Sequence, residues 1–309
     1  MVDNDDSLTW EGEMSQLDRR NRSWWRVLDE RSDVGGRVKS WLFLAHPGPS
    51  LLVTVVVVAA AGLLTRHLPS TRTAVGLTLV MLPGQLAIGA LNDWADVHAD
   101  GMAKPFKPIP RGAVARPAAL AVAMAGFAVS LGAASWLGRD VLAVAALGVS
   151  AGVAYDLGLK RTPAAVLAWC AGFAAVPLLA MVMTGQLHGA AEGMPLAALL
   201  ALALQLANGL PDSEGDRLVG AHTLASALGF GASRSVMCAA LGVAAVYVVA
   251  VRAPLGQSSL AVVAAGLIAA GGLVPLLPRG APRLAFPLLA VVAAVATVSW
   301  LAALPAAPV

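Results

Sequence analysis

The stretch "LLVTVVVVAAAGLL" (residues 51–64) carries no charged side chain and decides the fold. With its flanks it forms an apolar window of about 20 residues, the length that an α-helix needs to cross a bilayer. The whole chain has the same character, because hydrophobic residues make up 58% of its 309 residues and charged residues only 13%. A soluble domain has about 25% charged residues. The sequence therefore predicts an all-α, polytopic membrane protein.

Eight further apolar windows of similar length follow this one. Together with the first, at 48–67, they lie at 72–92, 115–136, 139–158, 163–184, 194–211, 233–252, 258–277 and 283–304. Nine transmembrane helices are therefore predicted. The links between the third, fourth and fifth windows are so short that these helices must be antiparallel neighbours.

The distribution of lysine and arginine predicts the orientation. With the N-terminus placed in the cytoplasm, all 21 basic residues fall in cytoplasmic segments except Arg66, Arg72, Arg139 and Arg252, in agreement with the positive-inside rule. We therefore expect a multi-pass protein of the cell membrane. Residues 1–40 do not form a secretory signal and are expected to be a soluble or membrane-surface tail before a transmembrane domain at 41–309.

Acidic residues are concentrated in two short segments. Nine of the eighteen lie in the first 33 positions, and six of the other nine belong to "LNDWADVHAD" (91–100) and "NGLPDSEGD" (208–216), namely Asp93, Asp96, Asp100, Asp212, Glu214 and Asp216. An ionised carboxylate near mid-membrane costs about 2.5–3.5 kcal/mol on insertion scales. A cavity, cations or basic partners are therefore expected to compensate for this concentration of charge.

The spacing of these polar residues places them on one side of each helix end. On regular helices, Asn92, Asp93, Asp96 and Asp100 fall within an arc of about 100°, and Asn208, Asp212 and Asp216 within about 80°. Carboxylate and amide oxygens suit Mg²⁺, which proteins hold with one or two carboxylates plus substrate phosphates. The predicted metal ligands are Asp93, Asp96, Asp100, Asp212 and Asp216. A solvated helix end explains one such cluster, but it explains two matched clusters less well.

Basic residues follow the acidic segments, in "GMAKPFKPIPRG" (101–112), in "YDLGLKRTP" (155–163) and at Arg217. A diphosphate next to a metal needs such cations to neutralise its remaining charge, although the positive-inside bias alone also places basic residues here. The predicted diphosphate-binding set is Asn92, Lys104, Lys107, Arg111, Lys160, Arg161, Asn208 and Arg217.

Other chemistries lack their motifs. No P-loop, GxGxxG turn or HExxH segment is present, which argues against nucleotide and zinc sites of those kinds. The net charge of +3 requires no nucleic-acid partner. Cys170 and Cys238 lie inside apolar segments without a CxxC pairing and are expected to be core residues.

The acidic motifs resemble those of the UbiA superfamily of intramembrane prenyltransferases. "NDWADVHAD" fits NDxxDxxxD, "NGLPDSEGD" fits NxxxDxxxD and its DxEGD variant, and "KPFKPIPRG" and "YDLGLKRTP" are similar to further family segments. The resemblance covers the chain from about residue 42 to the ninth span. It implies nine helices around a central cavity that opens laterally to the membrane. It also implies two Mg²⁺ ions that bridge an isoprenyl diphosphate at the cytoplasmic end.

The resemblance also implies roles for individual residues. Lys104 and Lys107 stand where family members often have arginines. Lys160 stands where a diphosphate-contacting lysine is usual in the family, and Tyr155 matches the tyrosine that precedes this lysine in family members. These four residues are the candidate catalytic groups. The chain departs from the family pattern at Gly101, which replaces a common basic residue, and at His46, where many members have arginine.

The resulting hypothesis is a Mg²⁺-dependent intramembrane prenyltransferase. Metal and basic residues withdraw charge through the diphosphate, the allylic C–O bond ionises, and an acceptor captures the carbocation in a dry cavity. The expected partners are an isoprenyl diphosphate, membrane lipid and an unidentified acceptor, which is an aromatic or quinone precursor, a tetrapyrrole or a lipid. One alternative is a terpene cyclase, in which the substrate's own alkene captures the cation. Another is a transporter that uses the acidic pairs as a cation site.

Overall fold

The computed structural model of the chain describes residues 34–44, 46–187, 189–218, 221–252, 258–274 and 282–304. The long helices are α3 (Pro47–Thr65), α4 (Thr71–Ala95), α6 (Arg116–Leu137), α7 (Arg139–Leu157), α8 (Ala165–Thr184), α9 (Ala190–Gly209), α11 (Leu224–Arg252), α12 (Ser258–Gly271) and α13 (Pro282–Ala302). The short elements are α2 (Val34–Leu44), α5 (Val97–Ala103), η1 (Leu159–Arg161), η2 (Leu210–Asp212) and α10 (Ser213–Leu218). No strand occurs among the described residues.

Among the residues that the structure describes, eight helices are long and apolar enough to cross a membrane. This confirms the prediction of an all-helical, multi-pass membrane protein. The remaining predicted span, at 258–277, corresponds to α12, whose 14 residues extend about 21 Å against a hydrocarbon core of about 30 Å. Residues 275–277 lie outside the described part of the chain, as do residues 1–33 of the predicted tail.

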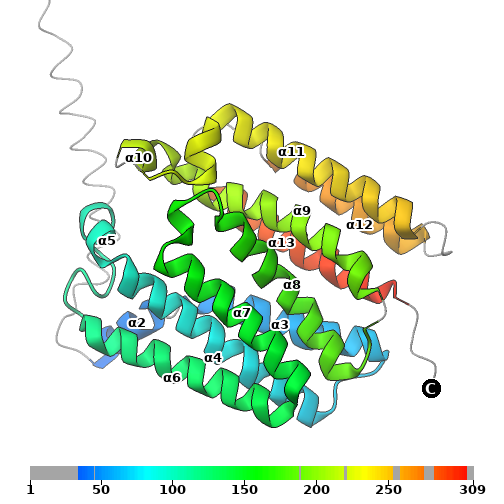
Figure 1. Cartoon of the computed structure of the whole chain (residues 1–309), viewed down its shortest axis with the longest axis horizontal. Helices are drawn as coiled ribbons and strands as arrows, with labels where there is room; N and C mark the ends of the chain where they lie inside the picture. The colour runs from blue at the N-terminus through cyan, green and yellow to red at the C-terminus, as the bar shows by residue number, and fades with distance from the viewer. Residues whose placement is uncertain are drawn as a thin grey trace, which may run out of the picture.

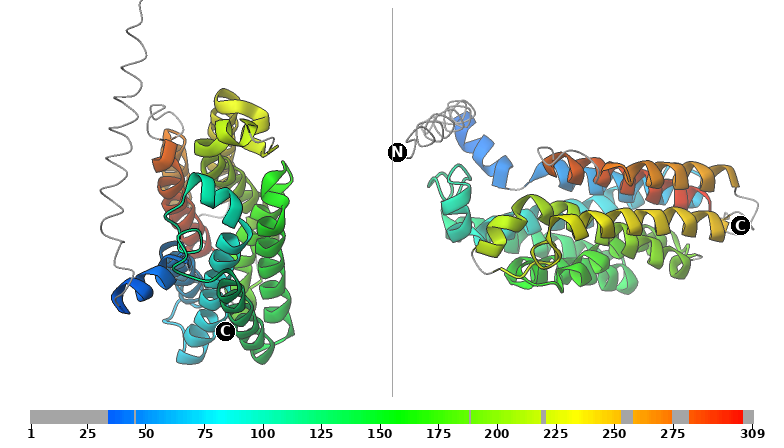
Figure 2. Two further views of the ribbon diagram at one scale, coloured as in Figure 1. Left: turned by 90° about the vertical axis from the view of Figure 1, so that its left-hand side faces the viewer. Right: turned by 90° about the horizontal axis from the view of Figure 1, so that it is seen from above.

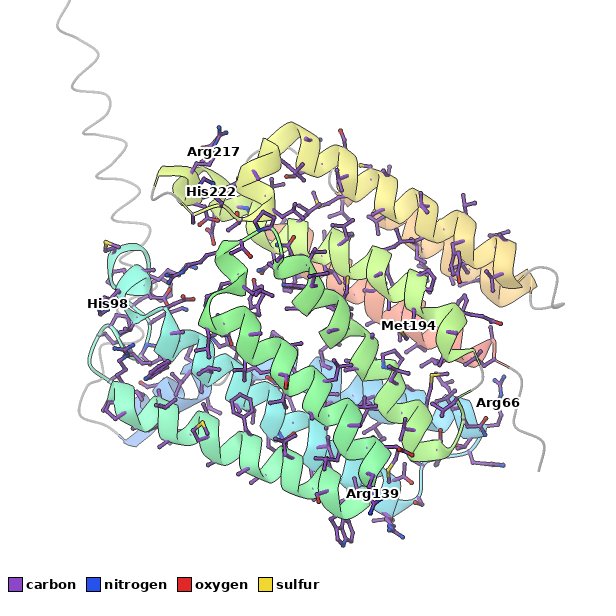
Figure 3. All side chains as sticks on the ribbon, in the orientation of Figure 1. Arg66, His98, Arg139, Met194, Arg217 and His222 are labelled. Carbon is purple, nitrogen blue, oxygen red and sulfur yellow. The ribbon has the colours of Figure 1, made fainter. Side chains whose placement is uncertain are left out.

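The long helices pack side by side into one bundle (Figure 1). Helix α3 contacts α4, α8 and α13, so the first and last spans are neighbours. Two views show α2, α5 and α10 together at one end of the bundle (Figures 1 and 2). At the other end, the guanidinium of Arg66 donates hydrogen bonds to the carbonyl oxygens of Ala302 at 2.7 Å and Leu304 at 2.8 Å (Figure 3).

Small residues let α4 and α6 approach closely. A Cβ atom added at Gly126 would lie 2.8 Å from the carbonyl oxygen of Pro83 and 2.9 Å from Cβ of Ala87. The hydroxyl of Ser130 donates a 2.6 Å hydrogen bond to the carbonyl oxygen of Val80. Helices in lipid associate through close packing and interhelical hydrogen bonds, because lipid is as apolar as their side chains. These contacts fix α4, whose C-terminal end carries the first acidic motif.

Candidate functional site

A break in the helix reorganises the first acidic motif. Helix α4 ends at Ala95, Asp96 has φ −90° and ψ 7°, and α5 then begins at Val97. The regular helix that the spacing predicted across 92–100 is therefore not formed. The aspartates have different partners, because Asp93 and Asp100 contact one lysine while Asp96 contacts another.

Lys107 bridges Asp93 and Asp100. Its Nζ lies 2.7 Å from Oδ1 of Asp93 and 2.6 Å from Oδ2 of Asp100, and both aspartates are buried. Burial alone would lower the pKa of Lys107, but its hydrogen bonds to the two carboxylates outweigh this effect and raise it. Burial raises the pKa of Asp100 although Lys107 opposes the shift. Nε2 of His46 also lies 3.2 Å from Oδ1 of Asp93.

Lys160 links Asp96 to the end of α7. Its Nζ lies 2.6 Å from Oδ2 of Asp96 and 3.7 Å from Oδ1 of Asp156. Asn92 donates a 2.8 Å hydrogen bond from Nδ2 to the same Asp156 oxygen. The guanidinium of Arg161 lies 3.7 Å from Oδ1 of Asp96 and is more exposed than Lys160. The turn η1, which follows α7, thus brings both basic residues to the first motif.

The second motif also falls on a helix break, where α9 gives way to η2 and then α10. Asp212 is 64% exposed, and its Oδ2 lies 3.9 Å from Nζ of Lys104. This ion pair connects the second motif to the segment that follows the first motif. Asp216 accepts a 3.1 Å hydrogen bond from the hydroxyl of Thr223. The two acidic motifs, more than 100 residues apart in sequence, therefore lie at the same end of the bundle.

Tyr155 stands between this polar end and an apolar interior. Its side chain interacts with that of Asn208, and its ring packs edge-on against Trp169 with the centroids 6.1 Å apart. Trp169 stacks on Phe173 at 5.7 Å and contacts Phe286 edge-on at 6.1 Å. From Phe173, an apolar pocket extends between α8, α9 and α13 toward the opposite end, where Met194 lies (Figure 3).

Two further residues of the predicted diphosphate-binding set, Arg111 and Arg217, have different surroundings. Arg111 donates a 2.6 Å hydrogen bond from Nη2 to the hydroxyl of Ser40 on α2. Arg217 is exposed, and its side chain points away from the bundle (Figure 3). Conversely, sequence reasoning gave no site role to Asp156. The sequence feature that could have identified Asp156 is an acidic residue at the end of an apolar span, beside the tyrosine and lysine of "YDLGLK".

The donor chemistry of the site fits Mg²⁺, the metal that the sequence motifs imply. Its side chains offer hard carboxylate oxygens, and the buried Oδ2 of Asp93 has no hydrogen-bond partner. Among the residues that the structure describes, no three Asp, Glu, His or Cys side chains come close enough to hold a metal by themselves. This arrangement agrees with a metal that one or two carboxylates share with phosphate oxygens, rather than with a closed protein cage.

Comparisons with known proteins agree with the fold and the motifs. The chain matches the UbiA prenyltransferase family over residues 51–282. It is 30% identical over 195 residues to digeranylgeranylglyceryl phosphate synthase of Thermococcus kodakarensis. This alignment covers 62% of this chain and 69% of that protein. It is 28% identical over 193 residues to the synthase of the same name from Pyrococcus abyssi. This alignment covers 62% of this chain and 70% of that protein.

Solved structures show the same fold. A UbiA homolog from Aeropyrum pernix K1 aligns with a TM-score of 0.68 and 20% identity, covering 80% of this chain and 95% of that chain. A UbiA homolog from Archaeoglobus fulgidus bound to GPP and Mg²⁺ aligns with a TM-score of 0.68 and 15% identity, covering 85% and 99%. Because the family match spans most of the sequence, the chain belongs to the UbiA prenyltransferase family and is a membrane-embedded prenyltransferase.

Proposed function

We propose that this enzyme ionises an isoprenyl diphosphate at the end of the bundle where α5 and α10 lie, and transfers the prenyl group to a lipid acceptor in a Mg²⁺-dependent reaction. The observation that carries this proposal is the convergence of the two carboxylate motifs and three lysines at one end of an apolar bundle. Lys107, Lys160 and Lys104 lie 2.6–3.9 Å from carboxylates of the two motifs.

Under this proposal, the carboxylates hold the metal and the lysines hold the diphosphate. The metal ligands are Asp93, Asp96, Asp100, Asp212 and Asp216. When bound, Mg²⁺ supplies Lewis-acid stabilisation of the charge that develops on the diphosphate. Lys104 is the most exposed of the three lysines and has the longest ion pair, at 3.9 Å, so its ammonium is the freest to bind phosphate oxygens.

The apolar interior supports the second half of the reaction. The ring of Tyr155 stands at its entrance, where an aromatic face stabilises an allylic cation. The Trp169, Phe173 and Phe286 rings behind it exclude water and give the prenyl chain an apolar path toward the pocket between α8, α9 and α13. Excluding water prevents hydrolysis of the reactive cation.

Product analysis tests the transferase proposal. Among the three acceptor classes, the name of the curated relatives favours a glyceryl phosphate lipid. Purified protein in lipid nanodiscs should release diphosphate from geranylgeranyl diphosphate and Mg²⁺ when such a lipid is added, and should form the prenylated lipid. A cyclised hydrocarbon or terpene alcohol formed without acceptor would instead establish the cyclase. Cation flux without diphosphate cleavage would establish the transporter.

We also propose that the domain at 41–309 crosses the membrane nine times, with the N-terminus and the site in the cytoplasm. The supporting observation is that the basic residues near α5, η1 and α10 share one end of the bundle. In a variant whose two cysteines are replaced by alanine, Glu214→Cys should react with a membrane-impermeant maleimide only from the cytoplasmic side. Leu187→Cys, which is exposed between α8 and α9, should react only from outside. The reverse labelling pattern would overturn the orientation.

A further inference from the structure

Asp156 is a buried carboxylate that belongs to neither acidic motif. It lies near the end of α7 with 3% of its surface exposed. Its Oδ1 accepts the hydrogen bond from Asn92 and faces Lys160, whereas its buried Oδ2 has no hydrogen-bond partner. Taking a carboxylate out of water costs several kcal/mol, and a buried ion pair often gains no net stability over apolar residues. Stability alone is therefore a poor reason for an aspartate in this position.

The contact with Asp156 determines which end of the Asn92 amide faces the site. A carboxylate only accepts hydrogen bonds, so the NH₂ group of Asn92, and not its oxygen, must point toward Asp156. The Oδ1 atom of Asn92 then faces away from Asp156. An amide without this partner would be free to turn its NH₂ group in either direction, and an NH₂ group repels a cation.

The same carboxylate also orients Lys160. The ammonium lies 2.6 Å from Asp96 and 3.7 Å from Asp156, so it is held between a residue of the first motif and a residue outside it. Asp156 thus connects α7 to two groups of the site, Asn92 on α4 and Lys160 on η1. In metal sites, such outer partners fix the orientation of the ligands, and losing one typically costs 10–100-fold in metal affinity or activity.

We propose that Asp156 is a positioning residue that presents the amide oxygen of Asn92 and the ammonium of Lys160 to the metal and diphosphate. The proposal rests on the proposed function and deepens it, because it adds to the site a carboxylate of α7 that lies outside both acidic motifs. It differs from a purely structural role in one measurable respect. A structural residue changes the amount of folded enzyme, whereas a positioning residue changes the affinity of the folded enzyme for the cation.

The test compares Asp156→Asn with Asp140→Asn, an exposed aspartate at the other end of the same helix. Binding of Mn²⁺ to each purified protein is measured from the electron paramagnetic resonance signal of the free ion, with geranyl thiolodiphosphate present as an unreactive substrate analogue. We expect Asp156→Asn to weaken Mn²⁺ binding by about 10-fold or more and to lower turnover by about 10–100-fold. Asp140→Asn should change neither quantity. Mn²⁺ affinity in Asp156→Asn equal to that of the unsubstituted protein would overturn the proposal.

Two further measurements separate positioning from packing. In the Asn92→Ala background, Asp156→Asn should cost much less than it does alone, because the amide it orients is gone. Asp156→Glu keeps a carboxylate acceptor and should bind Mn²⁺ better than Asp156→Asn. Independent, multiplying losses, or a Glu variant no better than the Asn variant, would each contradict the positioning role. Unchanged turnover in both Asp212→Asn and Asp96→Asn would instead defeat the proposed function itself.

Discussion

Asp212→Asn is expected to lower the rate of diphosphate release by about 10²–10³-fold, the usual cost of losing one group that stabilises transition-state charge. Asp212 is well suited to this test because its side chain is 64% exposed and its only described ion pair, with Lys104, spans 3.9 Å. Substitutions at exposed positions away from special features change stability by less than about 0.5 kcal/mol. A loss of activity at Asp212 therefore reports on the chemistry and not on folding.

The measurement is release of inorganic diphosphate from geranylgeranyl diphosphate by purified protein, with thermal unfolding followed in the same detergent. Asp96→Asn should show a similar loss from the other motif, where the side chain is 20% exposed and bonded to Lys160 at 2.6 Å. Asp140→Asn, an exposed carboxylate far along α7 from Asp156, serves as the control and should retain full activity. Normal turnover in both Asp212→Asn and Asp96→Asn would disprove the metal–diphosphate site.

Lys107→Met is expected to give the largest loss of stability. Removing the ammonium leaves Asp93 and Asp100 as neighbouring buried carboxylates without the cation that lies 2.6–2.7 Å from each. Breaking a buried ion pair by deleting one partner typically costs about 3–5 kcal/mol, and the melting temperature should fall by roughly 10 °C. The matched control is Lys104→Met, whose ion pair is exposed and 3.9 Å long and whose melting temperature should not change.

Adding a divalent cation provides a further test of the Lys107→Met prediction. If Asp93 and Asp100 are metal ligands, Mg²⁺ will bind the folded Lys107→Met protein in place of the ammonium and raise its melting temperature, since a ligand that binds only the native state stabilises it. The rise should exceed that of the unsubstituted protein, in which Lys107 competes for the same oxygens. An equal rise in the two proteins, measured with and without a chelator, would show that these two carboxylates are not metal ligands.

Much of the fold follows from local sequence. The apolar window at 51–64 and its successors predict spanning helices because backbone groups in lipid must bond within their own helix. In the described part of the chain, eight of the nine expected spans are found. The remaining window, at 258–277, corresponds to the 14-residue α12. Composition predicts that this window is helical, but the length of its regular helix depends on packing against its neighbours.

The candidate site was less predictable in its details. Spacing on a regular helix grouped Asn92 with Asp93, Asp96 and Asp100. In the structure the helix breaks at Asp96, and these residues have three different partners: Asp156 for Asn92, Lys107 for Asp93 and Asp100, and Lys160 for Asp96. Spacing rules apply only where the helix continues. The break at Asp96 has no proline or glycine beside it to locate it, whereas the second break falls at Gly209 and Pro211, residues that interrupt helices. Sequence spacing also could not show that Arg111 donates a hydrogen bond to Ser40 on α2, and its role as a diphosphate ligand stays a prediction.

The sequence by itself determined that the chain is helical and that it spans the membrane, and it predicted that two carboxylate motifs and their lysines share a function. These properties depend on composition and on spacings of a few helical turns. The hydrophobic effect and the cost of charge in lipid restrict which residues can occur over such short stretches, so the sequence alone reveals these properties. Only the tertiary structure decided that Lys107 bridges Asp93 and Asp100, and that Asp156 reaches Asn92 from another helix. The Asn92–Asp156 contact joins two helices 64 residues apart in sequence, and the Lys107 contacts depend on how the segment after α5 folds back onto α4. No helical spacing pattern contains either contact.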